Sequence, residues 1–226
     1  MLEAVVFDFD GVIADSEPLH FQSFRDVLSA ENIALTESEY YERYLGLSDR
    51  AAFRAVSDQR GTTWSDRQTV ELMGRKAARF EELERDAQLI FPAADRLVRE
   101  AASVVPIAVA SGARRVEILR ILDRADLTRC FAAVIAVEDV AAGKPAPDPY
   151  LRALERLSAA AARIISPRRS VAIEDSRRGI ESARAAGMKT VVVTTSPVAG
   201  IEDGSDLVVP SLAALSLTDL QRLTDD

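Results

Sequence analysis

Six short apolar runs, separated by segments with helical spacing, constrain the fold of this chain most strongly. The runs are rich in Val and Ile, and several are apolar without interruption, as expected for strands covered on both faces. They span residues 3–9, 105–111, 132–138, 170–175, 189–195 and 206–210. Helical patterns stand between the later runs, at residues 114–125, 149–157 and 177–187. This alternation predicts an α/β fold with a doubly wound, mostly parallel, Rossmann-like sheet.

One long segment interrupts the alternation. Residues 16–88 contain no convincing strand and show several helical patterns, punctuated by Gly46 and Gly61. We predict a four-helix module inserted after the first strand. The expected domains are an α/β core of residues 1–15 and 89–226 and a helical domain of residues 16–88.

Composition excludes several classes of function. The chain has 226 residues, of which 48% are apolar, so it can bury a large core. Its formal net charge is −8, and no basic stripe is present, so nucleic acid is not an expected partner. The single cysteine excludes an intrachain disulfide. No segment approaches the ~20 apolar residues that cross a bilayer, and no leader pattern is present. We therefore expect a cytoplasmic protein without a membrane partner or an evident obligate protein partner.

The first predicted strand ends in two acidic residues, Asp8 and Asp10, one residue apart. Ligands of open α/β sheets bind beyond the carboxyl ends of the strands. Two carboxylates this close disfavour each other's ionisation, and a divalent cation with oxygen ligands removes that conflict. Turn-forming aspartates beside Gly11 are an equally good local explanation. Whether Asp8 and Asp10 form a reaction site or a structural turn therefore depends on which residues follow the other strands.

Three other strand ends carry polar residues suited to phosphate chemistry. The second run is followed by Ser111 and Gly112, whose hydroxyl and backbone amides can hold phosphate oxygens, although a plain strand-to-helix turn fits equally well. The loop after the third run carries Lys144, which by itself reads as an ordinary solvated lysine. The fourth run ends in Glu174 and Asp175. Adjacent residues of a strand point to opposite sides, so at least one of these acids must face the same edge as the first pair.

Taken together, these strand ends resemble a known superfamily. The segments DFDGV, ASG, GKPAPD and IEDS are similar to the four signatures of the haloacid dehalogenase superfamily, in the family's order along the chain. The resemblance covers essentially the whole sequence, and the helical insertion is similar to the family's small helical cap. Within the superfamily, the segments around the first and fourth signatures look most like the group that contains β-phosphoglucomutase and small sugar-phosphate phosphatases.

The resemblance implies catalysis through an aspartyl phosphate. Asp8 would be the nucleophile that attacks phosphorus, which splits one hard displacement into two easier ones. Asp10 would be the general acid that protonates the leaving oxygen and then the base that activates water. Ser111 and Lys144 would hold the transferring phosphoryl group.

Magnesium is the cofactor that the resemblance implies. Mg²⁺ would be held by Asp8, by the backbone carbonyl of Asp10 and by Asp175, with Glu174 as a ligand or directly behind the ligands. A divalent ion and one lysine would supply the positive charge that phosphoryl transfer needs in an otherwise acidic protein.

Further residues are candidates for substrate binding, and each has an ordinary structural alternative. His20 and Lys76 match residues that serve the site in relatives, but a packing histidine and an exposed helix lysine explain them as well. The mutase grips a second phosphate with a cap arginine; here Asp49 stands in that place and Arg50 follows it. The remaining candidates lie in the loop after the second strand: Gly112, Arg114 and Arg115. The two arginines could bind a distal phosphate or simply be solvated in the first turn of a helix.

We therefore expect Mg²⁺-dependent hydrolysis of small phosphorylated metabolites, with sugar phosphates as the favoured class. The missing cap arginine favours a phosphatase over the runner-up, a phosphosugar mutase. A dehalogenase is less favoured because Asp10 and the Glu174–Asp175 pair suit phosphoryl transfer with magnesium. A catalytically idle binding protein is disfavoured because every catalytic position is filled.

Overall fold

The computed structural model describes residues 1–195 and 204–225 of the chain. It divides into two compact units. The first, the core unit, is Met1–Asp15 with Ile90–Asp226, and the second, the helical unit, is Ser16–Leu89.

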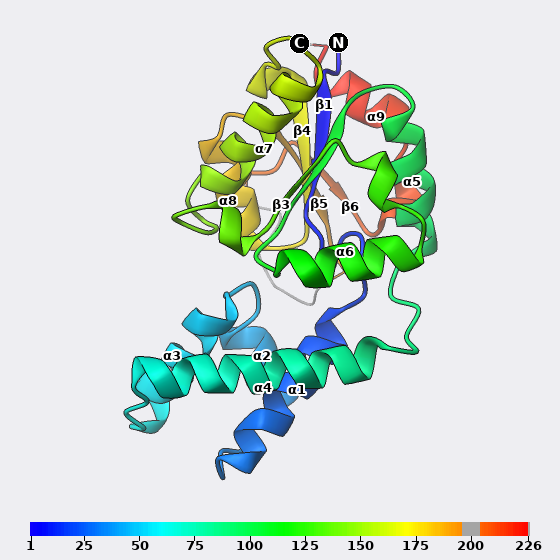
Figure 1. Cartoon of the computed structure of the whole chain (residues 1–226). Helices are drawn as coiled ribbons and strands as arrows, with labels where there is room; N and C mark the ends of the chain where they lie inside the picture. The colour runs from blue at the N-terminus through cyan, green and yellow to red at the C-terminus, as the bar shows by residue number, and fades with distance from the viewer. Residues whose placement is uncertain (196–203, 226) are drawn as a thin grey trace. The chain divides into compact units, whose positions relative to one another are not determined.

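A six-stranded parallel sheet forms the centre of the core unit (Figure 1). The strand order is β3-β2-β1-β4-β5-β6, so β1 lies between β2 and β4. The strands are β1 (Ala4–Phe7), β2 (Ile107–Ala110), β3 (Ala133–Ile135), β4 (Ser170–Glu174), β5 (Lys189–Val193) and β6 (Leu207–Val209). The α/β fold and all six predicted strands are confirmed. The predicted runs were longer because they included residues such as Asp8 and Ser111, which directly follow the ends of β1 and β2.

Helices cover both faces of the sheet (Figure 1). On one face, α7 (Asp148–Ala160) and α8 (Arg177–Ala185) pack on the strands. Small strand residues such as Ala108 and Ala172 share a buried cluster there with Tyr150 and Leu157 of α7. The other face carries α5 (Pro92–Ala102), α6 (Arg115–Arg124) and α9 (Leu217–Arg222). Right-handed crossovers require this division, because β1 to β3 and β3 to β5 run across the sheet in opposite directions.

Two of these helices, α5 and α9, were not predicted. The buried residues of α5 are Ala94, Leu97, Val98 and Ala101, an apolar stripe at ordinary helical spacing. Charged residues occupy the other face, so α5 has an ordinary amphipathic pattern that the sequence analysis overlooked. The α9 helix is only six residues long, too short for the periodicity to be recognised.

The helical unit has four helices and its own aromatic core. They are α1 (Glu17–Ala30), α2 (Glu37–Arg43), α3 (Asp49–Arg60) and α4 (Asp66–Glu84). Phe24 and Phe53 pack in the centre, with ring centroids 4.5 Å apart and ring planes inclined by 42°, and Trp64 meets Phe53 edge-on. Side-chain oxygens of Thr36, Ser48 and Ser65 accept hydrogen bonds from amides in the first turns of α2, α3 and α4, which fixes where these helices begin.

In neither unit does the described part of the chain contain a helix long and apolar enough to span a bilayer.

Candidate active site

The carboxyl ends of the central strands bring the predicted catalytic residues to one edge of the sheet. Asp8 directly follows β1, Ser111 directly follows β2, and Glu174 is the last residue of β4. Lys144 lies in the loop between β3 and α7. Because the strands are parallel, all of these ends share one edge of the sheet.

Lys144 joins two of these strand ends through buried ion pairs. Its Nζ lies 2.7 Å from Oδ1 of Asp8 and 2.5 Å from Oε1 of Glu174. Glu174 is fully buried and Asp8 is nearly so. Burial lowers the pKa of Lys144, but the charges of Asp8 and Glu174 more than offset this, and the pKa stands above its ordinary value. Lys144 is therefore a fixed cation beside two carboxylates and not a solvated lysine.

A tight turn after β1 places Asp10 beside the loop that follows β2. In this turn the amide of Gly11 donates to the carbonyl of Ala14 at 2.8 Å, and the amide of Ala14 donates to the carbonyl of Phe9 at 2.9 Å. The Ser111 hydroxyl donates to Oδ2 of Asp10 at 3.5 Å, a long hydrogen bond. Asp10 and Ser111 are thus neighbours in the core unit.

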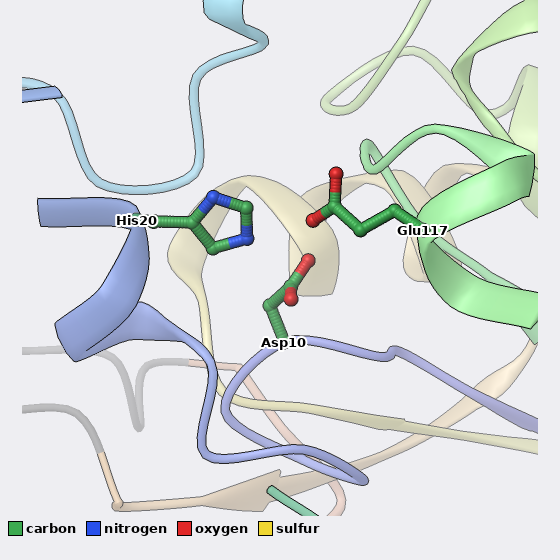
Figure 2. A group of neighbouring side chains, drawn as sticks. All are labelled: Asp10, His20 and Glu117. Carbon is green, nitrogen blue, oxygen red and sulfur yellow. The ribbon is translucent and has the colours of Figure 1, made fainter. Parts of the chain in front are cut away.

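Figure 2 shows Asp10 together with a second acid of the core unit, Glu117 in the first turn of α6. The two carboxylates point toward each other, with an oxygen of one within 4.8 Å of an oxygen of the other. His20, drawn in the same figure, belongs to α1 of the helical unit. The sequence analysis missed Glu117. The signal was an acid at the apolar spacing of its helix, because Glu117 is buried together with Ile121, four residues later.

Asp8, Glu174 and Asp175 form a group that can hold a metal ion. Each offers a carboxylate oxygen, and these oxygens lie within 4.8 Å of one another. All three residues are buried, and hard divalent cations such as Mg²⁺ prefer oxygen ligands. The donor set therefore fits the cofactor expected from the sequence.

Gly11 makes room for Asp175 in this group. Its φ is +76°, a left-handed conformation that side chains other than glycine rarely adopt. A Cβ atom at this position would lie 1.9 Å from Oδ2 of Asp175. No real contact is that short, so any side chain at position 11 would displace the Asp175 carboxylate.

We expect Gly11→Ala to weaken Mg²⁺ binding by about tenfold, the size of effect seen when residues that orient metal ligands are changed. Isothermal titration calorimetry with MgCl₂ measures this affinity. Gly74→Ala is the matched control, since nothing lies within 4 Å of a Cβ built there, in the interior of α4. Wild-type affinity in Gly11→Ala would contradict the placement of Asp175 in the metal site.

The buried acids disfavour each other's charge when no cation is bound. Burial, and then the charge of Glu174, raise the pKa of Asp8 to about 8, although Lys144 opposes the shift. A carboxyl whose pKa is raised by folding stabilises the fold at low pH, and this stability is lost as pH rises through the folded-state pKa.

We therefore expect the free energy of unfolding of the metal-free protein to fall as pH rises from about 5 to about 8. Urea unfolding in the presence of EDTA measures this, with Asp8→Asn as the comparison. The decline should be absent from the variant over the same window. Identical pH profiles for the two proteins would show that Asp8 does not titrate as its surroundings require.

The substrate-binding candidates of the core unit divide into two groups. Gly112 and Arg114 are exposed just beyond β2, where a ligand can reach them. Arg115 forms an ion pair with Asp139 and donates to the carbonyl of Val134 at 2.9 Å. These contacts hold α6 against the end of β3 and favour a structural role for Arg115 over phosphate binding.

The remaining candidates lie in the helical unit. Nζ of Lys76, in α4, lies 2.8 Å from Oδ1 of Asp49 and 2.6 Å from Nδ1 of His20. The His20 ring also stacks on Phe80, with centroids 4.3 Å apart. Arg50 follows Asp49 in α3 and is partly exposed. Lys76 and His20 are thus joined to each other within the unit, and contact of these residues with a substrate stays a prediction.

Comparison with known proteins identifies the family. The model of the haloacid dehalogenase-like hydrolase family matches residues 5–193, a range that contains all four signature segments.

The chain belongs to the haloacid dehalogenase-like hydrolases.

Named relatives of this haloacid dehalogenase-like hydrolase match along nearly their whole length. The chain is 30% identical to the phosphorylated carbohydrates phosphatase of Thermotoga maritima, covering 95% of this chain and 94% of the relative. It is also 30% identical to the β-phosphoglucomutase of Bacillus subtilis, covering 96% and 92%. Among solved structures, CbbY from Rhodobacter sphaeroides in complex with phosphate is similar with a TM-score of 0.85 and 26% identity, covering 97% and 99%. The family and fold predicted from the sequence are confirmed.

Two further residues of this hydrolase contact the site and were also missed from the sequence. Tyr150 donates its hydroxyl to Glu174, and Gly179 of α8 lies against the same carboxylate. Tyr150 lies on the buried apolar face of α7 with Leu154 and Leu157, and that pattern conceals the polar end of its side chain. Nothing in the sequence distinguishes Gly179 from a glycine that is merely tolerated in a helix.

Proposed function

We propose that this protein hydrolyses phosphate monoesters of small metabolites, with phosphorylated carbohydrates as the favoured class, through an aspartyl phosphate on Asp8. The observation that carries the proposal is the convergence of Asp8, Ser111, Lys144 and Asp175 at one edge of the sheet. The phosphatase and mutase relatives reported above support a phosphorylated sugar as substrate.

In the first step, a carboxylate oxygen of Asp8 attacks phosphorus, and the bond between phosphorus and the leaving oxygen breaks. Asp10 donates a proton to that oxygen, so the dephosphorylated product leaves as a neutral alcohol. In the second step, water attacks the phosphorus of the aspartyl phosphate while Asp10 takes up a proton from it. Inorganic phosphate leaves, and the Asp8 carboxylate is restored.

Other side chains hold the transferring group. The Ser111 hydroxyl and the neighbouring backbone amides donate to the phosphoryl oxygens. Lys144, already 2.7 Å from Asp8, offsets repulsion between that carboxylate and an anionic substrate. Positioning and cancellation of charge account for most of the catalysis in phosphoryl transfer.

Magnesium is the proposed cofactor. Asp8, Asp175 and the backbone carbonyl of Asp10 would hold it, and Glu174 stands directly behind them with both oxygens engaged by other donors. Bound there, Mg²⁺ would supply positive charge to the phosphoryl oxygens.

We propose that the helical unit serves as the cap and that Arg50, Lys76 and His20 approach the leaving group, with Gly112 and Arg114 contributing from the core unit. We also propose that the enzyme acts in the cytoplasm without a membrane, nucleic-acid or obligate protein partner.

A panel of phosphorylated metabolites, assayed for released phosphate with and without Mg²⁺, tests the function. We expect sugar and polyol monophosphates to be hydrolysed best, and EDTA to abolish the activity. No hydrolysis of any panel member or of p-nitrophenyl phosphate would overturn the proposal. Chloride release from 2-chloropropionate would favour a dehalogenase instead.

A phosphosugar mutase is the second candidate, favoured by similarity to the Bacillus subtilis β-phosphoglucomutase. Within the helical unit Asp49 stands where the mutase has its arginine and pairs with Lys76, so this position supplies no cation for a second phosphate. Supplying β-glucose 1-phosphate with a trace of the bisphosphate decides between the two. Free phosphate as the main product supports hydrolysis, and glucose 6-phosphate as the main product supports the mutase.

A further inference from the structure

Both carboxylate oxygens of Glu174 accept hydrogen bonds from neighbouring groups. It is completely buried. Its Oε1 accepts hydrogen bonds from Nζ of Lys144 and from the hydroxyl of Tyr150, each at 2.5 Å. Its Oε2 accepts from the amides of Asp175 and Ser176, at 3.2 and 3.3 Å, and from the Ser176 hydroxyl at 3.0 Å. A carboxylate with this many donors has one fixed position.

Tyr150 contacts both members of the Lys144–Glu174 pair. It is fully buried in α7, and its hydroxyl donates to Glu174. The face of its ring lies 5.3 Å from Nζ of Lys144, within the range of a cation–π interaction. Tyr150, which lies outside the four signature segments, therefore constrains both the carboxylate of Glu174 and the ammonium of Lys144.

Gly179 constrains the same carboxylate from α8. A Cβ atom at position 179 would lie 1.9 Å from both Cδ and Oε1 of Glu174. Gly179 does not have a left-handed backbone, so this position requires the absence of a side chain and not the conformational freedom of glycine. The helix can approach Glu174 this closely only because the residue is Gly.

The backbone of Lys144 is held separately from its ammonium group. Its carbonyl accepts a hydrogen bond from Arg178 at 2.8 Å, which secures the loop. The long, flexible side chain still requires a partner at its end. Apart from Asp8 itself, Glu174 is the acid that provides this partner within the described part of the site.

We propose that Tyr150 and Gly179 are positioning residues of the active site: they fix the carboxylate of Glu174, which in turn holds the ammonium of Lys144 against Asp8. The inference rests on the proposed function, in which Lys144 must meet the transferring phosphoryl group. Small displacements of such a group reduce the rate strongly, because the reacting geometry is lost.

The test compares Tyr150→Phe, Gly179→Ala and the double variant with the wild-type enzyme. The first removes one hydroxyl and keeps the ring. The second adds a methyl group to a helix, where alanine is favoured over glycine, and the atoms that it meets belong to the end of the Glu174 side chain and not to the backbone, so the variant is expected to fold. Leu151→Ala, at the exposed neighbour of Tyr150, and Gly74→Ala, in open space in α4, are the matched controls.

The readout is kcat for p-nitrophenyl phosphate with saturating Mg²⁺, at a temperature where circular dichroism shows every variant folded. We expect kcat to fall about tenfold in Tyr150→Phe, the effect of losing one hydrogen bond to a charged group, and at least as much in Gly179→Ala. Because both act through Glu174, the double variant should be no slower than Gly179→Ala alone. The two controls should keep wild-type kcat.

Wild-type kcat in both single variants would overturn the inference, and so would losses that simply multiply in the double variant. Urea unfolding of the wild-type protein, the two single variants and the double variant distinguishes failure of the positioning inference from failure of the proposed function. If the wild-type protein hydrolyses no phosphate ester, the proposed function falls. Non-additive changes in the free energy of unfolding would still support a shared action on Glu174, and additive changes would contradict it.

Discussion

Asp8→Asn should abolish phosphate release, lowering kcat by about 10⁴-fold or more, as the loss of an essential nucleophile does in other enzymes. The amide is nearly the same size as the carboxylate but is a far weaker nucleophile, so no aspartyl phosphate forms. Steady-state release of phosphate from p-nitrophenyl phosphate with Mg²⁺ measures the effect.

The Asp8→Asn variant is expected to fold, and a neighbouring acid provides a matched control. Asp8 carries a raised pKa because it is buried beside Glu174, so Asp8→Asn should fold and be more stable than wild type by roughly 1 kcal/mol in the absence of metal. Asp15→Asn, at an exposed acid of the same segment, is the control and should keep full activity. Substantial turnover by a folded Asp8→Asn variant would show that Asp8 is not the nucleophile.

Lys144→Met should lower both activity and stability. The substitution keeps most of the side-chain volume and removes the only charge that lies between Asp8 and Glu174 in the ion pairs described above. Breaking a buried pair costs about 3 kcal/mol or more. We expect a loss near the low end of this range, because Asp8 can take up a proton. Activity should fall by roughly 100-fold or more, since charge stabilisation of this kind contributes that much when a single donor is removed.

Magnesium provides the control for this prediction. If the loss of stability arises from uncompensated carboxylates, Mg²⁺ should restore more stability to Lys144→Met than it adds to wild type, in urea unfolding at neutral pH. Lys189→Met, at a lysine paired with Asp206 and about one-third exposed, should cost less than 1 kcal/mol. Equal losses in the two variants would show that Lys144 is an ordinary surface lysine.

The sheet could be predicted from the sequence because each of its strands is nearly continuous in apolar residues. The middle of β4, Val171–Ile173, is buried on both faces and has no polar residue to break the pattern. The α5 helix carries an ordinary amphipathic pattern and could have been predicted, whereas α9 is too short to show a period.

The candidate site was predictable only where its residues stand at strand ends. Parallel topology brings such ends together, so Asp8, Ser111 and Asp175 could be placed at one edge without knowing any distance. Contacts that depend on side-chain reach were not predictable. Glu117 meets Asp10 from the first turn of α6, where the signal is an acid at an apolar position, but its partner cannot be read from the sequence. Tyr150 meets Glu174 from the apolar side of α7, at a position that does not differ in pattern from a packing residue.

Chemical trapping of the intermediate tests the central claim most directly. Borohydride reduces an aspartyl phosphate to homoserine, and mass spectrometry of the digested protein locates the changed residue. With a substrate from the panel and Mg²⁺ present during turnover, we predict homoserine at position 8, and none there when either is omitted. Rapid release of phosphate with Asp8 unmodified, or with the change at another residue, would contradict the account.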